Sequence, residues 1–440
     1  MDPVTVIIML VGISILLILL SAGMPIAFSL GLSGLAGMAM LEGSGTATRI
    51  LETLPWDKTA SYTLTCVPMF VLMGQAAFTA GIGDRAYFLG DKWLGRIPGG
   101  LGIGTMAAGC VFGACSGSTT AAAAVLGRVA VPEMRKHGYD AGFAAAIVAT
   151  AGLLADLIPP SIAIVIYGSM TGESVGKALI AGIIPGILSA AVFSVWIYGV
   201  GLVHPHRAPR GEKSSWRDKL ISLRGILWVA VLFIGVFGGM FAGIFTPTEG
   251  GAIGACLSLA ILVVMNIGAG VGSIWKKLSE AFIETIHISI MIFTLLVGAA
   301  VFSYFLSLCR LPIIIEKTLG SSGLSPIWVL IIICLIYIPL GAFLDPLGTT
   351  LITLPVVYPL IIKLGYNGIW FCIIFVKMIE VGCLTPPVGE NCIIISSVVP
   401  DIPVERVYRN IAPFIMLECV IVAILIAFPD IVLWLPSMMK

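Results

Sequence analysis

Two long apolar runs dominate the hydropathy pattern of the chain, and a short polar stretch interrupts each run at its middle. Residues 99–137 form the first run and are interrupted at residues 116–120, which read Ser-Gly-Ser-Thr-Thr. Residues 326–364 form the second and are interrupted at residues 344–350, which read Leu-Asp-Pro-Leu-Gly-Thr-Thr. Each arm of the first run has about 17 residues, or roughly 25 Å of helix, which is short for a bilayer crossing.

The flanks of these runs predict that each is a re-entrant hairpin. Lys92 and Arg96 precede the first run, and Arg135 and Lys136 end it. If both basic flanks stay in the same aqueous phase, the segment must enter the membrane, turn at its polar tip and leave on the same side. Backbone of this kind is tolerated at membrane depth only where protein covers it or where it lines a cavity. The alternative is a pair of ordinary short helices with a polar kink.

The remaining apolar segments predict an internal repeat. Two further helices are expected to be broken, the first (141–170) at residues 156–161 and the second (368–399) at residues 385–391, and both breaks contain a Pro-Pro pair. The order helix, hairpin, broken helix, helix thus occurs twice. The other expected elements are helices at 4–21, 24–41, 60–80, 178–203, 225–245, 250–268, 284–308 and 411–435, an interfacial stretch at 42–58, and a basic loop carrying Arg85, Lys92 and Arg96.

Composition places the chain in the membrane. Of its residues 59% are hydrophobic and 11% charged, and the mean hydropathy is +1.09, values that a soluble protein of 440 residues does not reach. A net charge of +1 gives no indication of a nucleic-acid partner. The ten cysteines lie in apolar runs without metal-like spacing, so we expect them to be buried helix residues. The first helix lacks a basic n-region and is interpreted as retained.

The distribution of Lys and Arg predicts that the two repeats are inverted. Residues 207–224 carry six of them and are placed in the cytoplasm by the positive-inside rule. Following the chain from there puts sixteen Lys and Arg residues on the cytoplasmic side and seven outside, with Lys377 inside a helix. The first hairpin then opens to the cytoplasm and the second to the outside. Inverted repeats with broken helices are typical of secondary transporters.

The predicted fold class is therefore an all-α polytopic membrane protein with two inverted repeats, typical of a secondary transporter. We expect five regions along the chain. They are scaffold helices and an interfacial segment at 1–58, a first repeat at 59–203 with its hairpin at 99–137, a basic cytoplasmic loop at 204–224, a scaffold helix pair at 225–283, and a second repeat at 284–440 with its hairpin at 326–364. Gly81–Gly83 and Gly320–Gly323 are candidate hinges.

The tips and the breaks are where the chemistry is expected. Carbonyl groups there lose their helical partners, and the N-termini of half-helices point inward. Free carbonyls and hydroxyls suit a small hard cation such as Na⁺, and positive helix ends suit a substrate carboxylate. The candidate sodium ligands are Ser116, Gly117, Ser118, Pro159, Asp345, Gly348, Thr349, Thr350, Thr385 and Pro386. The candidate substrate contacts are Ser116, Ser118, Ser161, Thr350, Thr385 and Asn391. Small residues could instead be packing contacts between helices.

Charged residues inside apolar segments are a second indication of function, because burying them is costly. Asp345 lies at the second tip and is interpreted as functional. Asp156 adjoins a break and could cap a helix, and Glu390 could be a ligand or a cap. Lys377 and Glu380 are three residues apart on one helix, so we expect them to pair.

Several motifs resemble the large membrane subunit of tripartite ATP-independent periplasmic (TRAP) transporters. They are MPIAFSLGLSGLAG at 24–37, CSGSTTAAAA at 115–124, HGYDAGFAAAIVATAG at 137–152, IPPSIAIVIYG at 158–168, GIFTPTEGGAIGA at 243–255 and LTPPVGENCIII at 384–395. The chain departs from the family's pattern at three places. Members often carry an acidic or hydroxyl side chain shortly after the SGS motif, where this chain has Ala121–Ala124. Asp156 and Glu390 each stand where the family usually has an apolar residue.

The resemblance implies a sodium-coupled elevator that imports a small organic acid, with Na⁺ as the coupling ion and no organic cofactor. It implies a multi-pass protein of a bacterial or archaeal cytoplasmic membrane. The implied partners are a small four-helix membrane subunit and a soluble periplasmic substrate-binding protein.

Three other functions were weighed. A stand-alone sodium–carboxylate symporter would share the hairpins but need no binding protein. An intramembrane protease is disfavoured because residues 114–117 lack the glycine of a GxSG motif, Asp345 is not in a GxGD setting, and no membrane histidine is placed to activate Ser116. A channel is disfavoured because inverted tips suit alternating access.

Overall fold

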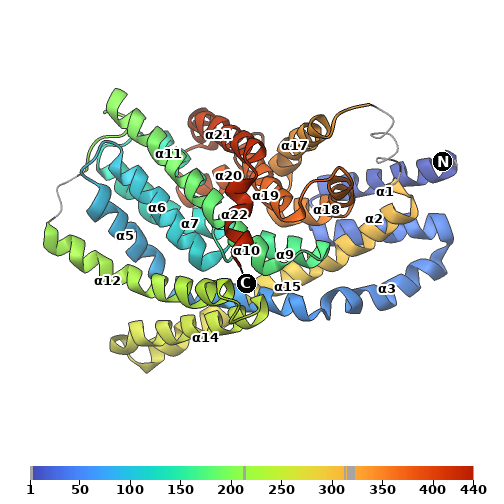
Figure 1. Cartoon of the computed structure of the whole chain (residues 1–440), viewed down its shortest axis with the longest axis horizontal. Helices are drawn as coiled ribbons and strands as arrows, with labels where there is room; N and C mark the ends of the chain where they lie inside the picture. Colours follow the sequence, from blue (N-terminus) through green and yellow to red (C-terminus); the bar gives the residue numbers. More distant parts are fainter. Residues whose placement is uncertain (1–2, 212–214, 312–313, 315–322, 440) are drawn as a thin grey trace.

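The chain folds almost entirely into helices in a computed structural model that describes residues 3–211, 215–311, 314 and 323–439 (Figure 1). No strand occurs within these ranges. The first half contains α1 (Pro3–Ser21), α2 (Ile26–Glu42), α3 (Ser44–Thr59), η1 (Tyr62–Thr65), α4 (Cys66–Thr79), α5 (Ile82–Leu94), α6 (Gly100–Ser116), α7 (Thr119–Lys136), α8 (Ala141–Leu157), α9 (Ile162–Thr171), α10 (Val175–Ala181) and α11 (Ile183–Val203).

The second half follows the most polar segment of the chain. It contains α12 (Trp216–Phe233), the π-helix η2 (Ile234–Gly238), α13 (Gly239–Phe241), α14 (Pro247–Asn266), η3 (Ile267–Ala269), α15 (Val271–Leu308), α17 (Pro326–Phe343), α18 (Pro346–Lys363), α19 (Gly368–Leu384), α20 (Glu390–Val398), α21 (Val404–Ala427) and α22 (Asp430–Ser437). Ten helices in the described ranges are long and apolar enough to cross a membrane.

The helices before the two breaks, α8 and α19, form the centre of the molecule. All but the first residue of α8 and all but Ile369 of α19 are buried. Helices buried on all sides are mostly apolar, because no face meets solvent or lipid. In Figure 1 the labelled half-helices α9, α19 and α20 lie in the middle of the assembly.

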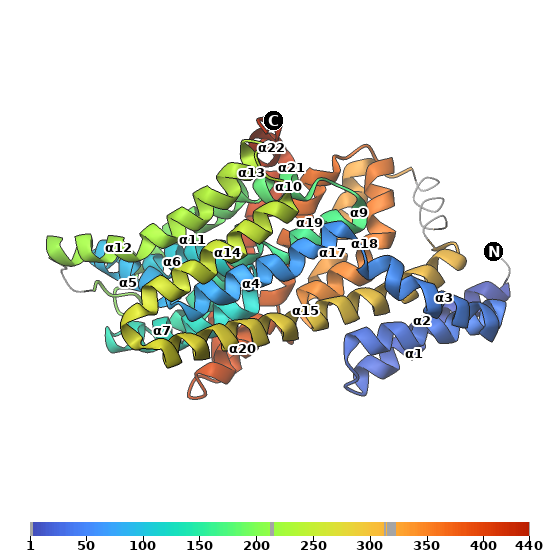
Figure 2. The same ribbon diagram turned by 90° about the horizontal axis from the view of Figure 1, so that it is seen from below.

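Long helices surround this centre. The 38-residue α15 is about 57 Å long at 1.5 Å per residue, and it packs along α2 through small residues. A Cβ atom on Gly34 would lie 2.9 Å from the backbone of Phe302, so the two helix backbones approach closely. Figure 2 shows α1, α2 and α3 together at one end of the long axis and α12 at the other.

The structure corrects several predicted boundaries. The segment around Arg85, which was expected to be a basic loop, forms the helix α5. Its inner face buries Ile82 and Ala86, and its charged residues lie on the other face. The stretch at 42–58, whose interfacial location stays a prediction, contains most of the helix α3, and α15 begins at Val271 rather than near 284. The final segment is two helices, because α21 ends at Ala427 and α22 follows.

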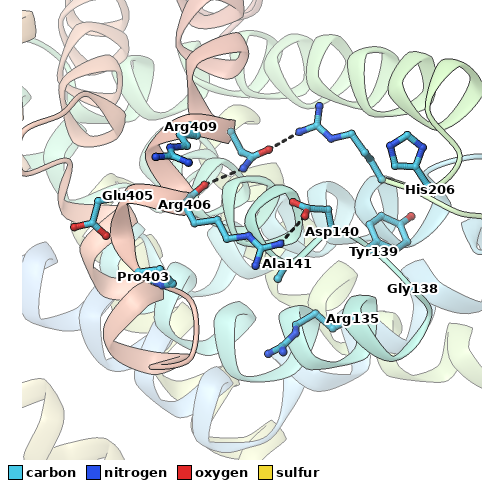
Figure 3. A pocket seen from close by; sticks show the side chains of 12 residues that line it. Arg135, Gly138, Tyr139, Asp140, Ala141, His206, Pro403, Glu405, Arg406 and Arg409 are labelled. Atoms are coloured by element: carbon cyan, nitrogen blue, oxygen red, sulfur yellow. Dashed lines mark hydrogen bonds and ion pairs between the residues drawn. The ribbon is translucent and has the colours of Figure 1, made fainter.

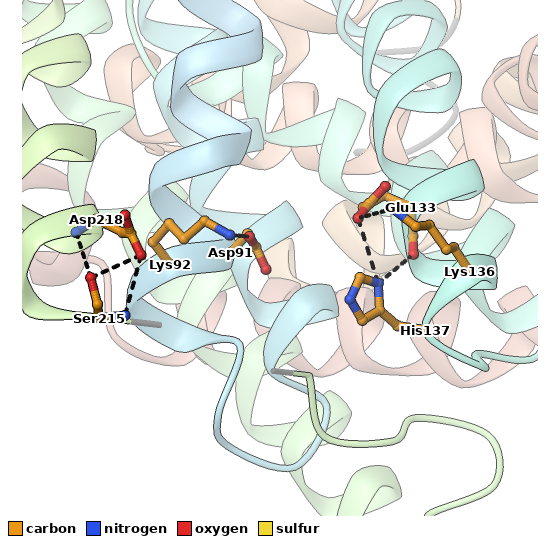
Figure 4. Close-up of polar contacts among 7 residues, drawn as sticks. All are labelled: Asp91, Lys92, Glu133, Lys136, His137, Ser215 and Asp218. Atoms are coloured by element: carbon orange, nitrogen blue, oxygen red, sulfur yellow. Dashed lines mark hydrogen bonds and ion pairs between the residues drawn. The ribbon is translucent and has the colours of Figure 1, made fainter. Parts of the chain in front are cut away.

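The predicted basic loop at 204–224 is also partly helical. Ser215 and Asp218 form a capping box, in which the Asp218 N–H donates to Ser215 Oγ (3.2 Å) and the Ser215 N–H donates to the Asp218 carboxylate (3.4 Å), so α12 begins inside the loop. Figure 4 shows this box near the Asp91–Lys92 ion pair of α5. Of the candidate hinges, Gly81 has φ +83° at the start of α5, whereas residues 320–322 lie outside the described ranges.

Candidate cation and substrate site

The first predicted tip is a tight turn between α6 and α7. Gly117 has φ +62°, a left-handed conformation that favours glycine. Ser118 then caps α7, since its Oγ accepts a hydrogen bond from the Ala121 N–H (3.4 Å). The Ser116 hydroxyl is buried and has no hydrogen-bond partner in the described part of the chain.

This tip contacts the first break directly. A Cβ atom on Gly117 would collide with the carbonyl oxygen of Pro160, and the Ile162 N–H donates to the Gly117 carbonyl (3.4 Å). Ser161 caps the second half-helix, α9, by accepting from the Ile164 N–H (3.2 Å). The N-termini of α7 and α9 therefore lie at the same place, beside the cis peptide bond of Pro159–Pro160.

The second predicted tip is the start of α18. Asp345 is its N-cap, and its carboxylate accepts hydrogen bonds from the N–H groups of Leu347 (3.1 Å) and Gly348 (3.2 Å). Thr350 donates to the Pro346 carbonyl (2.7 Å), while the buried Thr349 hydroxyl has no partner in the described ranges. A Cβ atom on Gly348 would lie 3.2 Å from Ile26 of α2, so this tip touches the α1–α3 end of the molecule.

The second break links the two halves of the chain. Thr385 donates to the Val381 carbonyl (2.7 Å), and a cis Pro386–Pro387 bond follows. At the start of α20, Asn391 Nδ2 donates across to the Ala149 carbonyl of α8 (3.0 Å). The Asn391 side chain is fully buried, and its Oδ1 has no partner among the described residues.

The two tips differ in how closely they meet their breaks. The first tip and first break are in contact. In the second half α17 and α19 approach each other one turn before the tip and the break, at Gly341 and Gly382, where a Cβ atom on either glycine would meet the other backbone. Glu390 at the start of α20 lies within electrostatic range of Asp345.

The acidic residues at the breaks do not cap the broken helices themselves. Asp156, on the last turn of α8, accepts a hydrogen bond from the Thr119 N–H at the start of α7. Its Oδ2 has no partner within the described ranges, and neither has Oε2 of Glu390. Asp156 thus lies near the first tip, and Glu390 near Asp345 of the second tip.

The donor atoms at these places suit a sodium ion. Ser116 Oγ, Thr349 Oγ1 and Asn391 Oδ1 are neutral, buried oxygens without protein partners in the described ranges. Neutral hydroxyl and carbonyl oxygens are typical ligands of hard cations. Within those ranges no cluster of three or more His, Cys, Asp or Glu side chains could hold a metal ion. The donor set thus fits a weakly held hard cation rather than a transition metal.

Comparison with known proteins decides the family. Residues 13–431 match the family described as "Tripartite ATP-independent periplasmic transporter, DctM component". The chain belongs to this family. The C4-dicarboxylate TRAP transporter large permease protein DctM of Pseudomonas aeruginosa is 34% identical over 414 residues, covering 93% of this chain and 94% of that protein. The ectoine TRAP transporter large permease protein TeaC of Halomonas elongata is 31% identical, covering 95% and 96%.

The solved structure of the Alcanivorax borkumensis YdaH transporter supports the fold. It has a TM-score of 0.64 and 14% identity, and the match covers 88% of this chain and 90% of that one. At this identity the likeness concerns the fold alone. The family match identifies the chain as a TRAP large permease, whose relatives are transporters. Together with the ten apolar helices, it places the chain as a multi-pass protein in the bacterial cytoplasmic membrane.

A polar pocket of about 950 Å³ lies away from the tips of this TRAP permease (Figure 3). It contains no predicted site residue. Arg406 of α21 pairs with Asp140 (2.7 Å), the N-cap of α8, and Arg207 donates to Asn410. Burial opposes ionisation of Asp140, but the Phe143 N–H and the Arg406 guanidinium hold its pKa below the usual range. We interpret this pocket as structural, because the Arg406–Asp140 ion pair on its wall joins α21 to the start of α8.

A buried charged cluster was only half predicted. Lys377 Nζ and Glu380 Oε2 are 2.7 Å apart, so the predicted pair is confirmed. Lys377 also forms an ion pair with Glu418 of α21 and donates to Ser189 of α11 (3.1 Å). The only signal for Glu418 in the sequence is that it is a single acidic residue in an otherwise apolar stretch.

Proposed function

We propose that this TRAP permease imports a small organic acid into the cytoplasm by sodium-coupled secondary transport. The observation that carries the proposal is the set of buried oxygens without protein partners at the two tips and the second break, in a chain that belongs to a transporter family. A cation bound there would supply the missing partners. Its electrochemical gradient would then drive uptake.

Two sets of residues would bind sodium. Ser116, Gly117, Ser118 and Pro159 form the first set, where tip and break are in contact. Asp345, Gly348, Thr349, Thr350, Thr385 and Pro386 form the second. Asp345 would add a formal negative charge close to the ion while its other contacts keep α18 capped.

The substrate would bind between the two sets. The N-termini of α7, α9 and α18 carry partial positive charge, which favours a carboxylate. Ser118 and Ser161 cap two of these helices, and Asn391, at the end of the second break, has a carbonyl oxygen without a partner among the described residues. Together with Ser116, Thr350 and Thr385 they would contact the substrate. The relatives named above are a C4-dicarboxylate and an ectoine transporter, both of which are named for small organic acids.

Two protein partners are part of the proposal. A soluble periplasmic protein would deliver the substrate, and a small four-helix membrane subunit would pack on the scaffold. The isethionate TRAP transporter permease protein DctMQ of Oleidesulfovibrio alaskensis is 29% identical, and the match covers 94% of this chain but 64% of that protein. A larger permease therefore exists in the family. In this chain an apolar pocket between α2, α3 and α15, lined by Phe28, Leu32 and Leu51, offers a surface for the small subunit.

The proposed movement is of the elevator type. The unit formed by residues 98–167 and 326–397 would carry both tips and both breaks, and would move against α1, α2, α3 and residues 225–268. Contacts within the unit support its moving as one body. Asn391 binds the backbone of α8, and a Cβ atom on Gly127 of α7 would lie 3.0 Å from Ile395 of α20.

Replacing Asp345 with asparagine tests the proposed sodium site. Asparagine keeps the size of the side chain and an oxygen that can cap α18, but it removes the charge. We expect the sodium concentration for half-maximal transport to rise about tenfold, equivalent to about 1.4 kcal/mol, with little change in thermal stability. Sodium-dependent uptake in proteoliposomes gives the value.

The matched control is Asp57→Asn, which changes an exposed aspartate of α3. It should leave the sodium dependence unchanged. An Asp345→Asn protein with the wild-type sodium affinity would show that Asp345 is a helix cap and not a cation ligand.

A further inference from the structure

The cluster of Lys377, Glu380 and Glu418 lies where three helices meet. Lys377 and Glu380 come from α19, Glu418 from α21, and Ser189 from α11 supplies a hydroxyl. The side chains of all three ionisable residues have 0% exposure to solvent. None of them belongs to the proposed sodium or substrate contacts.

The charges of this cluster do not balance when all three groups are ionised. One ammonium group neutralises one carboxylate, which leaves a net negative charge in the interior. Oε1 of Glu380 and Oε1 of Glu418 also have no hydrogen-bond partner in the described part of the chain. An uncompensated charge buried this deeply in a membrane protein is strongly disfavoured.

The surroundings increase the imbalance. The charged groups that act on Glu380 are Lys377, Glu418 and Asp156, the last from α8. The charged groups that act on Lys377 are the two glutamates, and Lys377 is the charged group that acts on Glu418 besides the neighbouring Glu380. Asp156 is a further carboxylate, so it disfavours ionisation of Glu380. Among the described residues, no cation other than Lys377 acts on the cluster.

We propose that the Lys377–Glu380–Glu418 cluster binds one exchangeable proton, held by one of the two glutamates, which makes the cluster neutral. This is a proton site separate from the proposed cation sites. The proton has a position to occupy, because each glutamate presents an oxygen without a protein partner.

The position of the cluster links it to transport. Glu380 lies five residues before Thr385 on the same helix, or about 7.5 Å along its axis, so the cluster sits next to the second break. Asp156, which adjoins the first break, also acts electrostatically on Glu380. Loss of the proton would add a negative charge between the two breaks and change their relative stability. This link to transport rests on the proposed function, whereas the proton site itself does not.

Infrared spectroscopy of the purified wild-type protein in lipid tests the proton site. A protonated carboxyl group has a C=O stretching band distinct from the bands of carboxylates. We expect such a band at neutral pH, and we expect it to be lost in Glu380→Gln and in Glu418→Gln, because Lys377 neutralises the one glutamate that remains in each variant. Glu405→Gln, which changes an exposed glutamate at the start of α21, is the matched control and should leave the band in place.

The neutral glutamine also mimics the protonated acid. Each single variant should therefore fold normally and transport, with its rate no longer dependent on pH over the range in which the wild type changes. The double variant Glu380→Gln/Glu418→Gln leaves Lys377 without a counter-charge and should be much less stable than either single variant.

Spectra that keep the band in either single variant would overturn the proposal, and so would a band removed only by Asp156→Asn. A band that behaves as expected in a protein that transports no organic acid would establish the proton site and contradict the proposed function. The two results are thus distinguishable.

Discussion

Replacing Lys377 with methionine is expected to destabilise the protein by about 3–5 kcal/mol at neutral pH, because it leaves two buried glutamates without their cation. The loss should be smaller at acidic pH, since two protonated glutamates are neutral and can be buried at less cost. Thermal unfolding in detergent as a function of pH measures both effects.

Lys276→Met is the control for this experiment. Lys276 lies on the exposed surface of α15, and its replacement should change stability by less than about 1 kcal/mol at any pH. A Lys377→Met protein as stable as wild type at neutral pH would contradict the view that the lysine offsets a buried negative charge.

A covalent link between the proposed moving unit and the scaffold is expected to abolish transport. Cysteines at Ile26 of α2 and Leu347 of α18 lie on the two sides of the contact at the second tip, where a Cβ atom on Gly348 would approach Ile26. A short thiol crosslinker should join them. If the unit must travel past α2, uptake in proteoliposomes should fall to background after crosslinking and return after the linker is cleaved.

The matched control places both cysteines within the moving unit. Gly127 of α7 and Ile395 of α20 are in contact, and a link between them should leave most of the transport activity. The ten native cysteines, all free in the structure, must be replaced first. Full activity after the α2–α18 link forms would exclude an elevator and favour a local gate at the tips.

The positions of the turns could be predicted from the sequence because their signals are local. The expected break at 156–161 contains the observed end of α8, the one at 385–391 begins directly after the last residue of α19, and the tips fall where α6 and α17 end. Glycine, proline and capping serine or aspartate specify these places within a few residues. Apolar composition likewise specified the membrane class.

Amphipathic helices and tertiary contacts were harder to predict. The helix α5 carries enough charge to be taken for a loop, because its apolar residues occupy only one face. Ser189 and Glu418, two of the partners of Lys377, lie far from it in the sequence. Nothing local indicates such a meeting. The inversion of the repeats and the sodium sites remain predictions.

Sodium-driven uptake is the measurement that tests the central claim most directly. The permease would be reconstituted with its small subunit, and the soluble binding protein would be added loaded with an organic acid that it is shown to bind. We predict accumulation of the labelled acid when sodium is higher outside than inside, and none when potassium replaces sodium. Accumulation that is equally fast without sodium would contradict the account.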